Sequence, residues 1–258
     1  GRALTPDAIQ AALRVLSKFR RLAESRQVDK IVAVATSAVR EAENGGEFLH
    51  AVREQTGIRA RVISGTEEAR LIHLAAVYGV GSGDVAVVVD IGGGSVEITR
   101  GAGATIERGR SFKLGVIRLT ERFVKSDPLS TRDERKLVRH IYAEVGKYLD
   151  DIARAGFNRL IGTSGTILSL GALAVQQARE TDAALRNRRV SAKQLRRVRK
   201  QLLPLALDKR LRLAGLEPRR ADLSVAGVVL LDAIVRRLGA EEITLCDLSL
   251  REGLVLDY

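Results

Sequence analysis

Residues 85–99 read VAVVVDIGGGSVEIT, with two short segments rich in valine and isoleucine on either side of a glycine triplet. The segments 85–91 and 96–99 are too short for helices and favour buried strands. A second glycine turn at residues 101–103 then precedes a third segment of the same kind, 105–112. We therefore expect a meander of three strands.

Strands and helices alternate on both sides of this meander. Upstream, we expect strands at residues 30–35 and 59–63 and helices at 6–26, 37–43, 47–56 and 64–78. Downstream, we expect strands at 159–162 and 242–246 and helices at 116–124, 131–155, 166–177, 192–203, 219–238 and 249–256. Such alternation is typical of an α/β fold with a parallel or mixed sheet.

Three glycines within residues 79–83 mark the best place for a joint between domains, because they interrupt any regular element. We therefore expect an N-terminal lobe over residues 1–80 and a C-terminal lobe over residues 84–248. The second lobe would contain the glycine turn and a basic helical region. A closing helix over residues 249–258 would pack back on the N-terminal lobe.

The composition is that of a globular protein. The chain has 258 residues, of which 45% are hydrophobic and 29% charged, enough for one large domain or two lobes. No apolar run reaches the roughly 18 residues that suggest a membrane span, and the first residues do not resemble a signal peptide. We therefore predict a cytoplasmic protein without membrane contact. Cys246 lies in an apolar run and is expected in the core.

The net charge of +12 is concentrated in one region. Residues 179–220 contain 14 Lys or Arg against 4 Asp or Glu, a net of +10, so the rest of the chain carries only +2. Such a region favours a polyanion, although part of it would be an ordinary solvated helix face. Aromatic residues make up only 3% of the chain, which argues against base stacking and so against single-stranded nucleic acid as the main partner.

The turn Asp90-Ile91-Gly92-Gly93-Gly94-Ser95 carries the first candidate chemistry. Glycines permit positive φ and bring backbone N–H groups close to a ligand, so the turn could bind phosphate or could be only a tight turn. Asp90 at its start, with Glu97 beyond it, is suitably placed to hold magnesium through water. The turn is not a P-loop, because no Gly-Lys-Ser/Thr sequence follows.

The segment Ser64-Gly65-Thr66-Glu67-Glu68-Ala69-Arg70 begins a predicted helix. Ser64 and Glu67 fit a capping box, in which the glutamate reaches back to the N–H of the cap. This leaves Glu68 without a capping role and makes it a candidate general base that activates water. The alternative is a solvated acidic residue that favours the helix dipole.

Two other strand ends carry small polar residues. Gly162-Thr163-Ser164-Gly165-Thr166 leads from a strand into a helix, and the N–H groups at a helix N-terminus can bind an anion. Thr36-Ser37-Ala38-Val39-Arg40 is a similar strand end, with an arginine that could hold a phosphate.

Taken together and in this order, four segments closely resemble the exopolyphosphatase and guanosine pentaphosphate phosphohydrolase family. They are ATSAVREA at 35–42, ISGTEEARLI at 63–72, DIGGGSVE at 90–97 and GTSGTI at 162–167. The resemblance covers essentially the whole chain. It implies a two-lobed, actin-like (ribonuclease H-like) α/β fold with the active site in the cleft between the lobes.

The resemblance also implies a role for each candidate residue. Glu68 would be the general base, and Asp90 and Glu97 would bind Mg²⁺ or another divalent cation. The phosphate would be held by backbone and side-chain groups from several turns, namely those of Arg40, Gly92, Gly93, Gly94, Ser95, Gly162, Ser164 and Gly165. The expected reaction is in-line attack of water on a terminal phosphoryl group.

The resemblance leaves the substrate open between inorganic polyphosphate and guanosine pentaphosphate, and the basic region favours the polymer. A homodimer that extends the basic surface is an open alternative. The family's first phosphate hairpin, an Asp-x-Gly-Ser-Asn-Ser type of turn, is absent from this sequence. We expect it to lie in a segment that is missing from the recorded sequence, and we expect weak or no activity from a chain that truly lacks it.

Two other function classes are compatible with the residues. The first is a catalytically silent module that binds polyanions through residues 179–220. The second is a kinase of the same fold, which would need a nucleotide site and an acceptor pocket.

Overall fold

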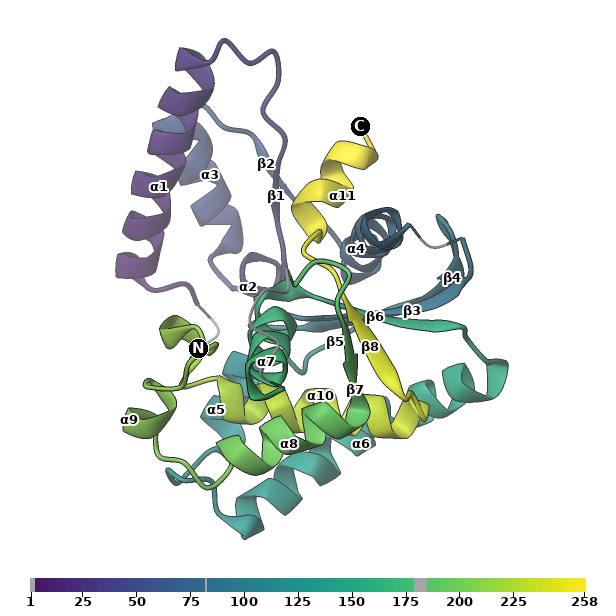
Figure 1. The fold of residues 1–258 in the computed structure, drawn as a ribbon. Helices are drawn as coiled ribbons and strands as arrows, with labels where there is room; N and C mark the ends of the chain where they lie inside the picture. Colours follow the sequence, from purple (N-terminus) through teal and green to yellow (C-terminus); the bar gives the residue numbers. More distant parts are fainter. Residues whose placement is uncertain (1–2, 82, 179–184) are drawn as a thin grey trace. The chain divides into compact units, whose positions relative to one another are not determined.

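The computed structural model describes residues 3–81, 83–178 and 185–258, and the chain forms two compact units, residues 1–68 and 69–258 (Figure 1). Helix α4, Gly65–Val80, contains the point of division within its first turn. The glycines at 79–83, which suggest a lobe boundary, lie instead at the end of this helix. The predicted basic region begins at Arg179, and its residues 179–184 lie outside the described residues.

The first unit is a small α/β unit with its own core. Helix α1, Pro6–Ser25, begins at the predicted residue and is capped by Thr5, whose side chain accepts a hydrogen bond from the Ala8 N–H. Strands β1, Ala33–Ala35, and β2, Ala60–Val62, pair in parallel, and two helices lie between them in sequence. These are α2, Ser37–Arg40, and α3, Gly45–Thr56. The buried core consists of Leu13, Phe48, Val52 and Ile58.

The second unit is built on one mixed sheet in the order β5-β4-β3-β6-β8-β7. Its strands are β3 (Val85–Ile91), β4 (Val96–Ala102), β5 (Thr105–Phe112), β6 (Arg159–Thr163), β7 (Arg189–Ser191) and β8 (Glu242–Leu245). The antiparallel pairs β3–β4 and β4–β5 confirm the predicted meander. Strand β6 runs parallel to β3, so these two strands end at the same edge of the sheet.

Alternating side chains of β3 bury both faces of this sheet. Val87 and Val89 join the larger core, which is shared with α6, α7, α8 and α10. Ala86 and Val88 face the opposite way and pack against Ile72 and Ala76 of α4. A sheet covered on both faces fits the run of valines, since strands buried on both sides lose the polar alternation of an exposed face.

The helices of the second unit mostly match the expected ranges (Figure 1). After α4 they are α5 (Val116–Phe123), α6 (Thr131–Ala155), α7 (Ser164–Gln177), α8 (Ala192–Leu202), α9 (Leu207–Arg210), η1 (Pro218–Arg220), α10 (Ser224–Leu238) and α11 (Leu250–Leu256). Among the described residues, no helix has the length and apolar character needed to cross a membrane. Cys246 is fully buried, as predicted.

Three local predictions were wrong or incomplete. The helix expected over 219–238 begins at Ser224, because the Ala221 carbonyl accepts hydrogen bonds from the side chains of Arg210 and Ser224. Thr131, with Glu134 three residues on, is the cap that the sequence pattern favours for α6, but the observed cap is Ser130, whose side chain accepts a hydrogen bond from the Asp133 N–H. Strand β7 was missed, since a single apolar residue in three gives no periodicity to detect.

Candidate active site

Glu68 lies in the first turn of α4 and is buried, with 7% of its surface exposed. Ser64 caps this helix, because its Oγ accepts a hydrogen bond from the Glu67 N–H at 3.1 Å. The cap therefore engages the residue before Glu68, as the sequence predicts. The Glu68 carboxylate instead accepts a hydrogen bond from Arg40, with 3.1 Å between Oε2 and Nη1.

Arg40 is held in place by the backbone as well as by this carboxylate. It is the last residue of α2, and its Nη1 also donates to the Ile63 carbonyl at 2.8 Å, directly after β2. Two residues predicted to act on phosphate chemistry are thus brought together within the first unit. Their contact is a partly buried ion pair, in which the side chains are 22% and 9% exposed.

The surroundings of Glu68 favour a proton acceptor. Burial raises the pKa of Glu68 above its ordinary value, and the hydrogen bonds from Arg40 and Thr36 and the charge of Arg40 offset only part of this effect. A carboxylate with a raised pKa is a stronger base than a solvated one, which suits proton abstraction from water near neutral pH.

The carbonyl groups of the glycine turn in the second unit are engaged by the start of α5 and by Arg118. Val116 N–H donates to the Gly92 carbonyl and Ile117 N–H to the Gly93 carbonyl, both at 3.0 Å, at the start of α5. Arg118 Nε donates to the Gly94 carbonyl at 2.7 Å. Within the described part of the chain, the backbone N–H groups of residues 93–95 donate to no acceptor. Adjacent backbone donors of this kind can bind an anion.

Glycine is required here for close packing, and the turn does not use the positive φ that glycine permits. None of the three turn glycines adopts a positive φ. The tight contact comes from Gly115, where a Cβ atom would lie 2.2 Å from the Gly93 carbonyl oxygen. A Cβ at Gly93 itself would lie 2.9 Å from Ile117 Cδ1. The turn therefore fits against α5 only without side chains at these positions.

Asp90 and Glu97 flank this turn as direct partners across the β3–β4 ladder. Opposite residues of an antiparallel pair project on the same face, with Cβ atoms about 5 Å apart. Both side chains are buried, with 6% and 2% of their surface exposed. Ser249 Oγ donates to Asp90 Oδ2 at 2.8 Å, and Ser111 Oγ donates to Glu97 Oε1 at 2.7 Å.

This pair of carboxylates has the donor chemistry of a magnesium site. Like charges placed directly opposite each other repel, and a divalent cation removes that repulsion. Among the described residues, no group of three or more His, Cys, Asp or Glu side chains is arranged around one point. Magnesium does not need such a group, since it commonly takes one or two carboxylates and completes its shell with water and phosphate oxygens.

A third turn follows β6, whose end lies beside the end of β3. Asp90 and Thr163 are register partners, and Ser164 begins α7 with a φ of +82°. The Ser164 Oγ donates to the Ile91 carbonyl at 2.9 Å and accepts from the Ile91 N–H at 3.3 Å. Ser164 therefore ties the start of α7 to the residue between Asp90 and the glycine turn.

The two glycines of this turn differ in their surroundings. Gly165 is partly exposed, and a Cβ there would lie 2.0 Å from Nη2 of Arg220, so this guanidinium lies directly over the start of α7. Gly162 is buried inside β6, where a Cβ would lie 2.5 Å from Ile243 Cδ1. The geometry gives Gly162 a packing role, and the phosphate contact predicted for it stays a prediction.

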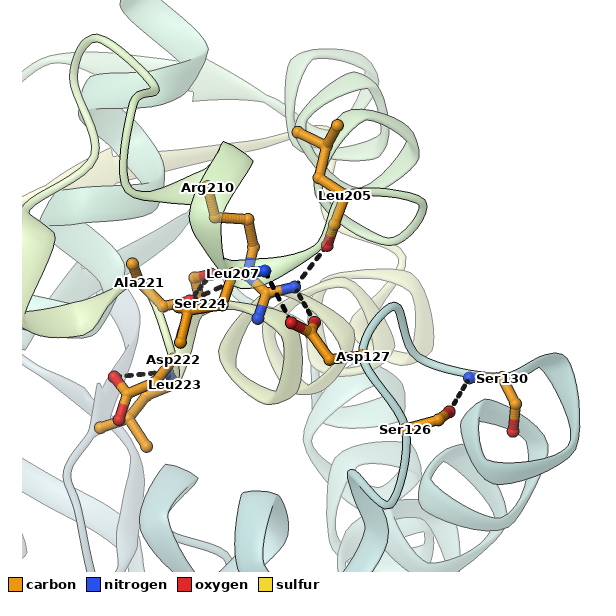
Figure 2. A network of polar contacts seen from close by, with 10 residues as sticks. All are labelled: Ser126, Asp127, Ser130, Leu205, Leu207, Arg210, Ala221, Asp222, Leu223 and Ser224. Atoms are coloured by element: carbon orange, nitrogen blue, oxygen red, sulfur yellow. Dashed lines mark hydrogen bonds and ion pairs between the residues drawn. The ribbon is translucent and has the colours of Figure 1, made fainter.

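Sequence reasoning assigned no role to Arg220, because nothing in the sequence places it beside Gly165. Its Nε donates to Glu217 at 2.7 Å, which leaves the rest of the guanidinium over the helix start. A buried network fixes the next residue, as Figure 2 shows: Arg210 Nε donates to the Ala221 carbonyl at 3.0 Å, and Arg210 Nη1 donates to Asp127 at 2.7 Å.

The chain matches a known family along nearly its whole length. The model of the Ppx/GppA phosphatase family matches residues 2–258. The protein named exopolyphosphatase 1 of Mycobacterium leprae (strain TN) is 33% identical over 256 residues, which cover 98% of this chain and 75% of that protein. Exopolyphosphatase 1 of Mycobacterium tuberculosis (strain H37Rv) is also 33% identical, over 257 residues, 98% of this chain and 74% of that protein.

Solved structures agree with the sequence match. A crystal structure of an exopolyphosphatase from Cytophaga hutchinsonii has a TM-score of 0.92 at 30% identity and covers 99% of this chain and 83% of that one. A Ppx/GppA family member from Aquifex aeolicus has a TM-score of 0.83 at 26% identity and covers 99% of this chain and 82% of that one. These similarities confirm the α/β fold that the resemblance implied. The chain is a member of the Ppx/GppA phosphatase family.

Proposed function

We propose that this protein is an exopolyphosphatase, which hydrolyses the terminal phosphoanhydride bond of inorganic polyphosphate. The observation that carries the proposal is the β3–β4 hairpin, where a glycine turn with its carbonyls engaged lies between two buried carboxylates, Asp90 and Glu97. Backbone donors suit the phosphate oxygens, and carboxylates suit the cation that accompanies them. The names of the similar mycobacterial proteins support the choice of polyphosphate.

Glu68 is the general base of the proposed reaction. Its Oε2 or Oε1 accepts a proton as water attacks the terminal phosphorus in line with the leaving phosphate oxygen. The raised pKa of Glu68 makes this transfer more favourable. Arg40 orients the carboxylate through its hydrogen bond and would release the ion pair partly when it binds phosphate oxygens.

The glycine turn stabilises the charge that develops on the phosphoryl oxygens. The N–H groups of residues 93–95 are fixed before substrate binds, because α5 and Arg118 hold the carbonyls of the same turn. Donors that need no reorganisation contribute more to the transition state than mobile ones do. Asp90 and Glu97 would hold Mg²⁺, which would neutralise phosphate charge when bound.

The direct test is phosphate release by the full-length protein, measured with long-chain polyphosphate and with guanosine pentaphosphate, each with Mg²⁺ and with EDTA. We expect magnesium-dependent release from polyphosphate. Release from guanosine pentaphosphate alone would assign the alternative activity of the same family. No release from either substrate would refute the proposal, and polyphosphate binding without release would favour the silent polyanion-binding module.

A pair of neighbouring variants separates catalysis from folding. Glu68→Gln should lose hydrolysis by about 10²- to 10⁴-fold, the usual contribution of a general base, while it still binds polyphosphate. Glu67→Gln, the matched control one residue away, should keep nearly full activity. Equal losses in both variants would make Glu68 a structural residue.

A further inference from the structure

Helix α8 carries charge of a single sign. Its sequence, AKQLRRVRKQL, contains five Lys or Arg and no Asp or Glu. Leu195, Val198 and Leu202 form its buried face. We call the four exposed basic residues opposite this face, Lys193, Arg196, Arg197 and Lys200, the cationic face of α8.

The four residues form one stripe along the helix. Their spacing of i, i+3, i+4 and i+7 places them on the same side, over a length of about 10 Å at 1.5 Å per residue. None of the four makes an ion pair with any residue that the structure describes. Like charges at these spacings repel one another, so the stripe opposes helix formation unless an anion neutralises it.

Arg199 shows that α8 is fixed with this stripe outward. It points to the inner side, where it pairs with Glu134 of α6 and lies 3.6 Å from Asp232 of α10. A capping box of Ser191 and Gln194 fixes the start of the same helix. The fifth basic residue is therefore used to hold the helix, whereas the other four have no structural partner among the described residues.

The charge continues along the chain toward the candidate active site. Residues 203–220 join α8 to Arg220, the residue that lies over Gly165. Besides the buried Arg210, this segment contains four basic residues that are at least partly exposed, Lys209, Arg212, Arg219 and Arg220, against two acidic residues. Neither α8 nor this segment contains an aromatic residue or a histidine. Without rings on which bases could stack, the surface suits an anion that consists of phosphate groups alone.

We propose that the cationic face of α8 is a binding subsite for long-chain polyphosphate, separate from the residues that perform hydrolysis. The proposal rests on the polyphosphatase activity proposed above. A long chain of phosphates can occupy the candidate active site with its end and α8 with a distant part, which raises its affinity through a second point of attachment. A short substrate gains nothing from α8.

The test compares two double variants that remove the same charge. Arg196→Gln with Arg197→Gln removes half of the cationic face of α8. Arg108→Gln with Arg110→Gln is the matched control on β5, at the opposite edge of the sheet from β7, which leads into α8. For each variant, kcat/KM is measured on long-chain polyphosphate and on tripolyphosphate at several salt concentrations.

We expect the α8 variant to lose about tenfold in kcat/KM on long chains. The loss should arise mainly through KM, because basic residues beside a polyanion contribute to its binding affinity by about this factor. Its kcat/KM on tripolyphosphate should not change. The slope of the logarithm of affinity against the logarithm of salt concentration should fall by about 1 for each cation removed. The β5 variant should resemble the wild type on both substrates.

Three results would overturn the inference: an unchanged kcat/KM on long chains, an equal loss on tripolyphosphate, or an equal loss in the β5 variant. A fourth is tighter α8-dependent binding of single-stranded RNA than of polyphosphate, which would assign the surface to nucleic acid. If the wild type hydrolyses neither substrate, the proposed function fails by itself. Titration of labelled polyphosphate against both variants then still decides whether α8 binds it.

Discussion

The raised pKa of Glu68 predicts opposite effects of pH on the rate of hydrolysis and on the stability of the folded state. Because the pKa of Glu68 is raised, the rate of hydrolysis should rise with pH over a range above the ordinary pKa of a glutamate. The raised pKa also means that the folded state favours the protonated form. Its contribution to stability is therefore present at low pH and is lost as the pH rises through the folded-state pKa.

This linkage gives a prediction that separates function from folding. Glu68→Gln should keep or increase the free energy of unfolding at neutral pH, because the neutral amide avoids the cost of a buried charge. Urea unfolding of wild type and variant at pH 5 and pH 8 measures this difference in the free energy of unfolding. The gain in stability of the variant should be larger at pH 8 than at pH 5. A clear loss of stability at pH 8 would show that the Arg40 ion pair outweighs burial.

Ser164 is the residue whose backbone strain lies nearest to the candidate chemistry. Its φ of +82° disfavours any residue with a Cβ, while its Oγ makes two hydrogen bonds with Ile91. Ser164→Ala and Ser164→Gly both lose these bonds, but only glycine relieves the strain. We expect the glycine variant to be about 1 kcal/mol more stable than the alanine variant in urea unfolding. Equal stabilities would mean that the backbone relaxes at this position.

At the residue scale, the sequence led to Glu68 by elimination, since the Ser64 cap accounts for its neighbour. The same reasoning could not identify Arg220, Ser111 or Ser249, which approach the candidate residues only through the fold. It also could not indicate the close packing at Gly162, because a buried packing glycine and a ligand-binding glycine look alike in a strand–turn–helix pattern.

At the scale of elements, the glycine turn and α5 form one rigid assembly, and Gly115 is its point of closest approach. Gly115→Ala would place a Cβ 2.2 Å from the Gly93 oxygen, so the turn or the helix must move. We expect a loss of roughly 2 kcal/mol in stability and a larger loss in phosphate affinity. Thermal unfolding and inhibition by inorganic phosphate measure the two effects.

The control for this prediction is a glycine that has space around it. Gly146 lies in the middle of α6, and a Cβ there would have its nearest neighbour at 3.8 Å, an ordinary contact. Gly146→Ala should therefore stabilise the protein by about 0.5 to 1 kcal/mol through helix propensity. Destabilisation by both substitutions would show that the distances at Gly115 do not explain the effect.

Helices and strands with strong periodicity were predictable, and those that depend on distant contacts were not. The meander around residues 92–95 follows from valine-rich segments separated by glycines. The start of α10 is set by Arg210, which contacts the Ala221 carbonyl from another helix. A boundary imposed by a side chain elsewhere leaves no local pattern in the sequence.

At the scale of the whole molecule, Arg210 joins several segments of the second unit. Its side chain is 3% exposed, and it donates to the Ala221 and Leu205 carbonyls and to Asp127 (Figure 2). Arg210→Ala should lower the free energy of unfolding by about 3 kcal/mol, because it leaves these acceptors without their donor. Lys209→Ala, an exposed neighbour on α9, should change it by less than about 0.5 kcal/mol.

The division of the molecule into units was the least predictable feature. Glycines at 79–83 suggest a flexible joint, whereas α4 continues as a regular helix to Val80 and the compact units divide at its first turn. Glycine raises the cost of a helix without preventing it, and the packing of Ile72 and Ala76 against β3 compensates. The fold class was predictable because alternation of elements survives such local exceptions.

The hydrogen bond from Ser249 to Asp90 spans 159 residues and has a consequence for synthesis. The ribosome releases the β3–β4 hairpin long before it makes Ser249, so a nascent chain holds the first carboxylate without its hydroxyl partner. The Asp90 site is complete only when Ser249 has been added. A messenger cut short before the codon for Ser249 therefore yields protein that contains every glycine of the turn and both carboxylates, but not the finished site.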